Sequence, residues 1–258
     1  MKLKNSDYSF LSAKSLILES QFPKIENLKS YLSLSIEIFI DFIKKSLNVD
    51  IESNNVDEIL QYDWDSTINR FKRTSNIEKL IKYFEIEKEF EKEDIKKEFL
   101  FEFENERLNK EIEILNFSEY LVNYIKTKID LFNILNFVKH KSFDLPFKFI
   151  KRGNMSLMIF KQFEKESLEN FVEYVNSKYP KLFEKDIKDF IQIFDKKRDD
   201  ILIDYLKRSR NIVFGPEILF SYLSLKNFNN INLRLVYNGI IYNLPHDKVI
   251  RRLRNING

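Results

Sequence analysis

The fold is decided by residues 214–254, which read FGPEILFSYLSLKNFNNINLRLVYNGIIYNLPHDKVIRRLR. Three turn signals divide this stretch into helix-sized pieces: Gly215-Pro216, Asn229-Asn230 and Asn243-Leu244-Pro245. Between the last two signals, apolar side chains recur at helical spacing, at Leu233, Val236, Tyr237, Ile240 and Ile241. The pattern predicts helices joined by turns rather than strands.

The rest of the chain has the composition of a folded helical protein. It has 258 residues, of which 43% are hydrophobic, including 25 Phe and 12 Tyr, so a sizeable core can be buried. Four glycines and five prolines lie mostly at predicted breaks. We expect helices over residues 7–19, 24–47, 75–115 (with Ser75 or Asn76 as N-cap), 117–127, 130–140, 155–163, 166–177 and 182–207, and two shorter ones around Trp64 in 56–72. The predicted fold class is all-α.

The chain contains an internal repeat. YLVNYIKTKIDLFNIL at 120–135 matches LFSYLSLKNFNNINLR at 219–234, and two shorter upstream matches occur in the same order. In this alignment Asn133 corresponds to Asn232, and each is expected to cap the first turn of a helix after a break near Asp130 or Asn229-Asn230. We predict three units, with residues 1–72 as an N-terminal helical unit and shortened first repeat, 73–154 as the second repeat and 155–258 as the third.

Sequence signals for catalysis are missing. The two histidines, His140 and His246, lie in different predicted units, and no HExxH, GxxxxGK[ST] or GxGxxG pattern occurs. The absence of cysteine excludes disulfides, thiol nucleophiles and Cys-ligated zinc. We therefore predict no catalytic residues, no metal, no cofactor and no small-molecule substrate.

Composition also bears on location and on partners. The chain starts with the polar sequence MKLKNSDYSF, and no apolar run approaches the roughly 18 residues of a membrane-spanning helix, so a cytoplasmic protein without a transmembrane segment is expected. The net charge of +3 is too small to imply nucleic-acid binding, and no recognition motif accompanies it. The basic residues at the end of the chain are explained by the helix dipole alone, and the alternative is contact with an acidic partner or anionic lipid.

The pattern near the end of the chain resembles the C-type subunit of the A/V-type rotary ATPases, which is the counterpart of the d-type subunit of the vacuolar ATPase. Upstream, DLFNIL at 130–135 and the turn Gly153-Asn154-Met155 are similar to the middle repeat of that family. The residues that carry the resemblance, taken as architectural, are Asn133, Gly153, Gly215, Pro216, Glu217, Tyr222, Asn232, Arg234, Gly239 and Pro245. Residues that the resemblance leaves as possible partner contacts are Lys226, Arg251, Arg252 and Arg254.

The resemblance implies a function as well as a fold. It implies similar helical repeats packed as a funnel-like array, and a non-catalytic central-stalk rotor subunit. Such a subunit lies peripherally on the cytoplasmic face of the membrane and joins stalk subunits D and F to the membrane proteolipid ring. It couples ATP hydrolysis or synthesis to H⁺ or Na⁺ transport. The alternative from the residues alone is a helical repeat scaffold that binds other soluble proteins.

Overall fold

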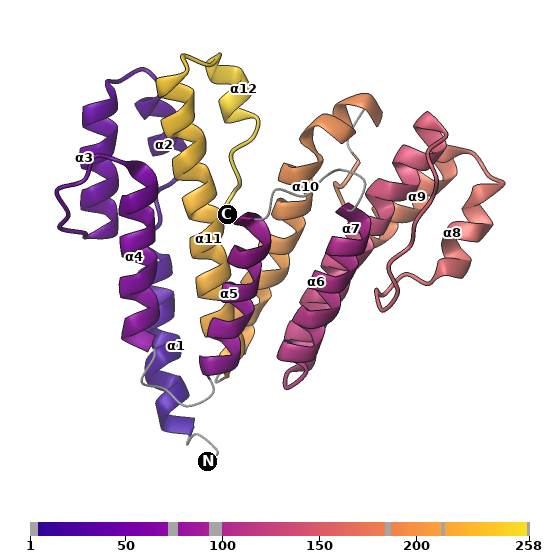
Figure 1. The fold of residues 1–258 in the computed structure, drawn as a ribbon, viewed down its shortest axis with the longest axis horizontal. Helices are drawn as coiled ribbons and strands as arrows, with labels where there is room; N and C mark the ends of the chain where they lie inside the picture. Colours follow the sequence, from indigo (N-terminus) through magenta and orange to yellow (C-terminus); the bar gives the residue numbers. More distant parts are fainter. Residues whose placement is uncertain (1–4, 72–76, 93–99, 184–186, 213–214, 257–258) are drawn as a thin grey trace. The chain divides into compact units, whose positions relative to one another are not determined.

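The computed structural model describes residues 5–71, 77–92, 100–183, 187–212 and 215–256, and Figure 1 shows its helices. In chain order they are α1 (Asn5–Glu19), α2 (Ile25–Tyr31), α3 (Ile36–Leu47), α4 (Val56–Phe71), α5 (Ile77–Lys92), α6 (Leu100–Leu115), α7 (Glu119–Phe143), α8 (Leu157–Glu164), α9 (Leu168–Lys178), α10 (Ile187–Lys207), the 3₁₀ helix η2 (Arg208–Asn211), α11 (Pro216–Ile241) and α12 (His246–Ile250). Within the described ranges there is no strand, and the prediction of an all-α protein is confirmed.

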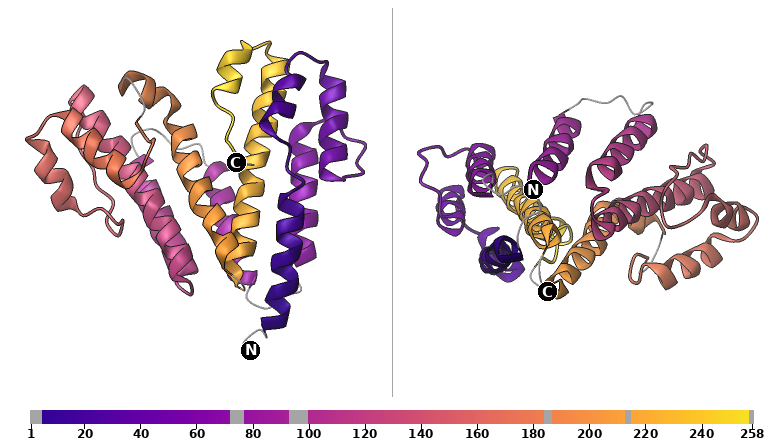
Figure 2. Two further views of the ribbon diagram at one scale, coloured as in Figure 1. Left: turned by 180° about the vertical axis from the view of Figure 1, so that it is seen from behind. Right: turned by 90° about the horizontal axis from the view of Figure 1, so that it is seen from below.

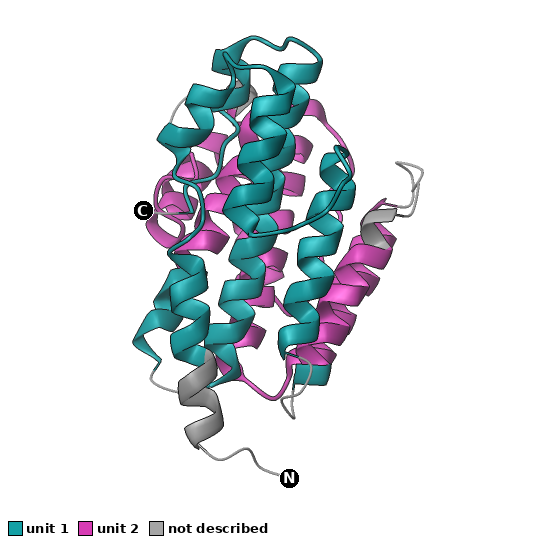
Figure 3. Ribbon diagram, turned by 90° about the vertical axis from the view of Figure 1, so that its left-hand side faces the viewer, with its two compact units in different colours: residues 1–78, 206–258 teal, residues 79–205 magenta. Residues whose placement is uncertain are grey.

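The chain forms two compact units (Figure 3). One contains residues 1–78 and 206–258, and the other contains residues 79–205. The first unit is therefore discontinuous, because α11 and α12 join the helices from the start of the chain. The division into three repeats remains a prediction.

Helix α11 is the centre of the first unit. It lies against α1, α2, α3, α4 and α12, and the views in Figures 1 and 2 agree on this arrangement. Its side chains are buried around most of its circumference, as expected for a helix with apolar residues on every face. The core on its C-terminal half combines Leu233 and Val236 with residues of α2, α3, α4 and the α12 region, namely Leu28, Leu32, Phe39, Ile40, Ile43, Val56, Ile59, Leu60, Val249 and Leu253.

Helix α7 has the same role in the second unit. Its buried apolar residues include Leu121, Ile125, Ile129, Ile134 and Val138. Near its C-terminal end, Phe137 contacts Phe147, Phe160 and Phe171, with ring centroids 5.3, 5.5 and 4.4 Å away, so aromatic packing joins α7 to α8 and α9.

Two predicted helix breaks are wrong. Helix α7 passes through Asp130 and α11 passes through Asn229-Asn230 without interruption. Asp and Asn favour turns because their short side chains compete for backbone hydrogen bonds, but here all three are buried in the middle of long helices. Tertiary burial has overridden local propensity.

Two other boundaries also differ from expectation. The single helix predicted over 24–47 is divided into α2 and α3 by a turn in which the Leu34 amide donates to the Tyr31 carbonyl at 3.0 Å. The two short helices expected around Trp64 are instead the continuous α4, because Trp64 is buried on its packed face. The predicted break at Gly215-Pro216 is correct, with Pro216 in the first turn of α11. The predicted caps Ser75 and Asn76 lie outside the described residues.

Gly239 allows α11 to approach its neighbours closely. A Cβ atom at this position would lie 2.9 Å from Val249 Cγ2 and 3.1 Å from Leu32 Cδ2. Both neighbours belong to the same hydrophobic core, so neither can move away freely. Glycine is required here because of packing rather than backbone conformation.

We expect Gly239→Val to destabilise the protein by about 1–3 kcal/mol through overpacking. The matched control is Asn238→Val, which introduces the same side chain at the exposed neighbouring position of α11. The measurement is the free energy of unfolding in urea. Equal stability of the two variants would contradict the packing role of Gly239.

Candidate functional site

The side-chain amide of Asn133 holds the segment that follows α7. Asn133 Nδ2 donates to the Ile150 carbonyl at 2.8 Å, and the Ile150 amide donates to Asn133 Oδ1 at 2.9 Å. Asn133 and Ile150 are both fully buried. The amide thus satisfies one backbone donor and one backbone acceptor that have no secondary-structure partner.

Asn232 forms the same pair of bonds in the first unit. Its Nδ2 donates to the Arg254 carbonyl at 2.9 Å, and the Arg254 amide donates to its Oδ1 at 2.9 Å. Both asparagines lie in the middle of a long helix, so the prediction that they are N-terminal caps is wrong. Each instead attaches the returning chain to its central helix, and we call the two arrangements the amide–backbone pairs.

Asp130 adds a second attachment in the unit of α7. Its Oδ1 accepts a hydrogen bond from the Met155 amide at 2.9 Å, and its Oδ2 accepts one from the Tyr179 hydroxyl at 2.5 Å. Burial raises the pKa of Asp130, which these hydrogen bonds oppose, and burial beside this carboxylate raises the pKa of Tyr179. A Cβ atom at Gly153 would lie 2.2 Å from Asp130 Oδ1, which accounts for glycine there.

Lys226 is buried within the first unit rather than exposed to partners. It is 4% exposed, and its Nζ lies 2.6 Å from Asp63 Oδ2 on α4. Burial lowers the pKa of Lys226 and raises the pKa of Asp63, while the attraction between the two charges opposes both shifts. The ammonium group is therefore already engaged within the chain.

The other motif residues on α11 have structural contacts. Tyr222 is buried between Phe22 and Phe71, with ring centroids 5.9 and 6.0 Å away. Arg234 Nε donates to Asp57 Oδ1 of α4 at 2.7 Å. At the two ends of α11, Glu217 lies in the first turn and Pro245 precedes α12.

The basic residues at the end of the chain separate into two kinds. Arg251 and Arg252 are exposed, whereas Arg254 is buried and its Nη1 donates to the Arg252 carbonyl at 3.0 Å. The structure therefore leaves Arg251 and Arg252 as the accessible members of the predicted contact set.

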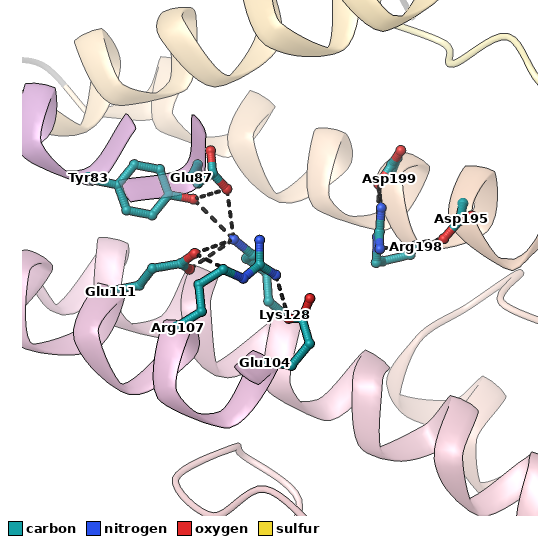
Figure 4. Close-up of polar contacts among 9 residues, drawn as sticks. All are labelled: Tyr83, Glu87, Glu104, Arg107, Glu111, Lys128, Asp195, Arg198 and Asp199. Carbon is teal, nitrogen blue, oxygen red and sulfur yellow. Dashed lines mark hydrogen bonds and ion pairs between the residues drawn. The ribbon is translucent and has the colours of Figure 1, made fainter. Parts of the chain in front are cut away.

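The second unit contains a buried charge network that the sequence analysis missed (Figure 4). Lys128 of α7 donates to Glu87 at 2.9 Å, to Glu111 at 2.8 Å and to the Tyr83 hydroxyl at 3.2 Å, and so links α5, α6 and α7. Arg107 adds an ion pair with Glu104 at 2.6 Å and lies 3.8 Å from Glu111. The network around Lys128 has no net charge, because it combines two acidic and two basic side chains: Glu87, Glu111, Lys128 and Arg107.

Burial raises the pKa of both central carboxyl groups and ion pairing lowers it, but the net shift differs between Glu111 and Glu87. Burial raises the pKa of Glu111, and Lys128 and Arg107 offset this only in part. Burial also acts on Glu87, but there Lys128 and Arg107 outweigh it and lower the pKa. Such networks could not be found from sequence, because Glu and Lys also fill solvated helix faces throughout this chain.

Helix α10 is attached to α7 by a symmetric tyrosine contact. The Tyr120 hydroxyl donates to the Tyr205 carbonyl at 2.7 Å, and the Tyr205 hydroxyl donates to the Tyr120 carbonyl at 2.8 Å. Nearby on α10, Arg198 pairs with Asp199 at 2.9 Å (Figure 4). The two tyrosine hydrogen bonds join α7 to α10 within one unit, whereas the Arg198–Asp199 pair lies within α10.

No group of three or more potential metal ligands occurs among the described residues. His140 Nδ1 lies 2.5 Å from the Leu145 carbonyl, so this ring belongs to the turn after α7. None of the described helices combines the length and the apolar character needed to cross a membrane.

A family model for the ATP synthase (C/AC39) subunit matches residues 23–252. The chain belongs to the ATP synthase (C/AC39) subunit family. The matched range contains both asparagines of the amide–backbone pairs, Asp130 and Lys226. Neither the curated proteins nor the solved structures gave a match.

Family membership confirms the resemblance seen in the sequence. The matched range begins after α1 and ends at Arg252, so both long central helices of this C/AC39 family member lie inside it. The chain is therefore a subunit of a V/A-type ATPase.

Sequence reasoning missed a second similarity between α7 and α11. The residues Phe143-Asp144-Leu145-Pro146 and Tyr242-Asn243-Leu244-Pro245 follow the two helices at the same 99-residue offset that relates Asn133 to Asn232. Extending the repeat alignment by eleven residues beyond Leu135, to Pro146, would have found it.

We expect Asn232→Leu to lower the free energy of unfolding by about 2–4 kcal/mol, because it leaves the buried amide and carbonyl of Arg254 without partners. Asn238→Leu, at an exposed position of the same helix, should change stability by no more than about 0.5 kcal/mol. Chemical denaturation compares the two. If Asn232→Leu were as stable as its control, the amide–backbone pair would not stabilise the first unit.

We expect Lys226→Met to destabilise the protein by about 3–5 kcal/mol at neutral pH, since it leaves the Asp63 carboxylate buried without a cation. The raised folded-state pKa of Asp63 sets the pH dependence. Stability that depends on protonated Asp63 is fully present below the unfolded-state pKa and lost as pH rises through the folded-state pKa. The penalty should therefore shrink as the pH falls toward the ordinary value of 3.8.

The double variant Asp63→Asn/Lys226→Met is the control for this prediction, because it removes both charges together. Its penalty should be smaller than that of Lys226→Met at neutral pH and nearly independent of pH. A pH-independent penalty for Lys226→Met alone would contradict the assignment of Asp63 as its buried counter-ion.

Proposed function

We propose that this C/AC39 family member is the non-catalytic central-stalk rotor subunit of its V/A-type ATPase. It forms a socket between stalk subunits D and F and the membrane proteolipid ring. Through this socket, ATP hydrolysis or synthesis is coupled to H⁺ or Na⁺ transport. The observation that carries the proposal is the family match over residues 23–252.

The internal construction of the chain supports a mechanical role. Torque passes through a subunit without loss only if its helices do not slide or separate. In each unit a buried central helix is bonded to the chain that follows it, through Asn133 to Ile150 and through Asn232 to Arg254. Satisfied buried polar contacts of this kind have a defined geometry and resist displacement.

Buried charges add to this resistance. Lys226 joins α11 to α4, and Lys128 joins α7 to α5 and α6. Pulling either lysine away from its carboxylates would leave unpaired charges in a water-poor interior, which is costly. These residues support torque transmission by keeping helices in register and do not themselves act on nucleotide or ion.

The surface proposal concerns the exposed arginines. We place the subunit peripherally on the cytoplasmic face of the membrane, and Arg251 and Arg252 contact an acidic surface of a neighbouring subunit of the ATPase. Lys226 and Arg254 are not part of this contact, because both are buried.

The proposal is tested by purifying the tagged full-length protein from its own cells. We expect subunits D and F and the proteolipid ring to co-purify with it. Arg251→Glu/Arg252→Glu should reduce this association by about tenfold or more. The control is Lys24→Glu/Lys29→Glu, an equal charge reversal at exposed positions of the same unit. If the unaltered protein retained neither stalk nor ring subunits, the proposal would be abandoned.

A further inference from the structure

The two central helices end in closely similar turns. The last residue of α7 and the three residues after it read Phe-Asp-Leu-Pro at 143–146, and the four residues after α11 read Tyr-Asn-Leu-Pro at 242–245. Asp144 and Asn243 both have left-handed backbone conformations, with φ of 54° and 47°. We call residues 143–146 the α7 tip and residues 242–245 the α11 tip.

The need to reverse the chain explains only two of the four residues in each tip, the Asp or Asn and the Pro. Asp or Asn is favoured in the left-handed conformation, and Pro prevents the helix from continuing. Neither requirement explains the aromatic residue or the leucine. These side chains are nevertheless exposed in both tips: Phe143 by 55% and Leu145 by 48%, and Tyr242 by 70% and Leu244 by 41%.

The exposure is not caused by a lack of interior space for aromatic rings. In the second unit Phe137, Phe160 and Phe171 are fully buried and contact one another close to the C-terminal end of α7. Phe143, two turns beyond Phe137, remains outside this cluster. Exposed apolar side chains that recur at equivalent positions of two repeats indicate a contact surface.

Positive charge accompanies both tips. Residues 139–152 contain Lys139, Lys141, Lys148, Lys151 and Arg152, against one acidic residue, Asp144, and of these Lys148 already pairs with Glu102. Residues 242–254 contain the exposed Lys248, Arg251 and Arg252, against one acidic residue, Asp247, whereas Arg254 is buried. A complementary surface is therefore apolar at its centre and acidic at its edge.

We propose that the α7 tip and the α11 tip are equivalent docking elements, which insert their aromatic and leucine side chains into repeated copies of one acidic-edged apolar pocket on a single oligomeric partner. This inference rests on the proposed function, which supplies such a partner in the membrane proteolipid ring. Two copies of one docking element on a chain match a partner that presents its binding surface more than once.

The geometry favours a protein pocket over a lipid surface. A bilayer accepts exposed aromatic and basic side chains in many orientations and does not require a particular turn. Here each tip has a left-handed Asp or Asn, followed by Leu-Pro and preceded by an aromatic residue. A pocket of defined shape requires this repetition of backbone geometry.

The experiment measures binding of the full-length protein to the purified proteolipid ring in nanodiscs made of neutral lipid. Phe143→Ser/Leu145→Ser and Tyr242→Ser/Leu244→Ser should each weaken binding by about tenfold or more, and the variant with all four changes should reduce it to background. The control is Leu16→Ser/Ile17→Ser, which alters an equally exposed apolar pair on α1.

Each variant is also tested for binding to the complex of subunits D and F, which the tips should leave unchanged. An unaltered protein that binds neither D–F nor the ring refutes the proposed function. If the unaltered protein binds the ring no more tightly than the four-residue variant, the role of the tips as docking elements is refuted, but the proposed function is not. Loss confined to one tip refutes their equivalence.

Two further measurements complete the test. Protein-free vesicles of anionic lipid should bind neither the unaltered protein nor the variants, and tip-dependent vesicle binding would replace the pocket by a lipid surface. Should a serine variant fail to fold, a photo-reactive benzoylphenylalanine at position 143 or 242 replaces it. Each position should cross-link to the ring subunit, and absence of cross-links at both positions overturns the inference.

Discussion

Each unit depends on the need to satisfy backbone hydrogen-bonding groups where the chain returns over a buried central helix. Ile150 and Arg254 each present an amide and a carbonyl in the interior, away from any helix of their own. Asparagine is suited to both, because its side chain is one donor and one acceptor in a fixed plane. With Asn133 and Asn232 in the middle of α7 and α11, the returning chain is bonded to each helix at Ile150 and at Arg254.

The same need to pair buried polar groups applies to other residues of the interior, whose contacts hold the helices together. Asp130 receives the Met155 amide and the Tyr179 hydroxyl, Lys226 pairs with Asp63, and Lys128 lies between Glu87 and Glu111. Removing any one of these groups would leave a partner unpaired in a water-poor interior. The contacts that hold each unit of this C/AC39 family member together are costly to break, which agrees with the rotor role proposed for it.

The structure also changes which residues are available to partners. Lys226 and Arg254 belong to the interior, while Arg251 and Arg252 remain exposed. The two tips add apolar surface that the sequence motifs did not single out. Because the tips recur at one offset and share a left-handed turn, the internal repeat relates their exposed surfaces as well as their cores.

The sequence by itself determined the all-α class, the breaks at Gly215-Pro216 and Pro245, the sequence match that aligns Asn133 with Asn232, and the family. These follow from local signals: helical periodicity, residues that cannot continue a helix, and ordered matches along the chain. Only the tertiary structure decided that α7 and α11 are continuous through Asp130 and Asn229-Asn230, that the asparagines bond to distant backbone, and that Lys226 is buried. Burial decides each of these, because a polar side chain that would end a helix in water instead bonds to chain brought near it by folding.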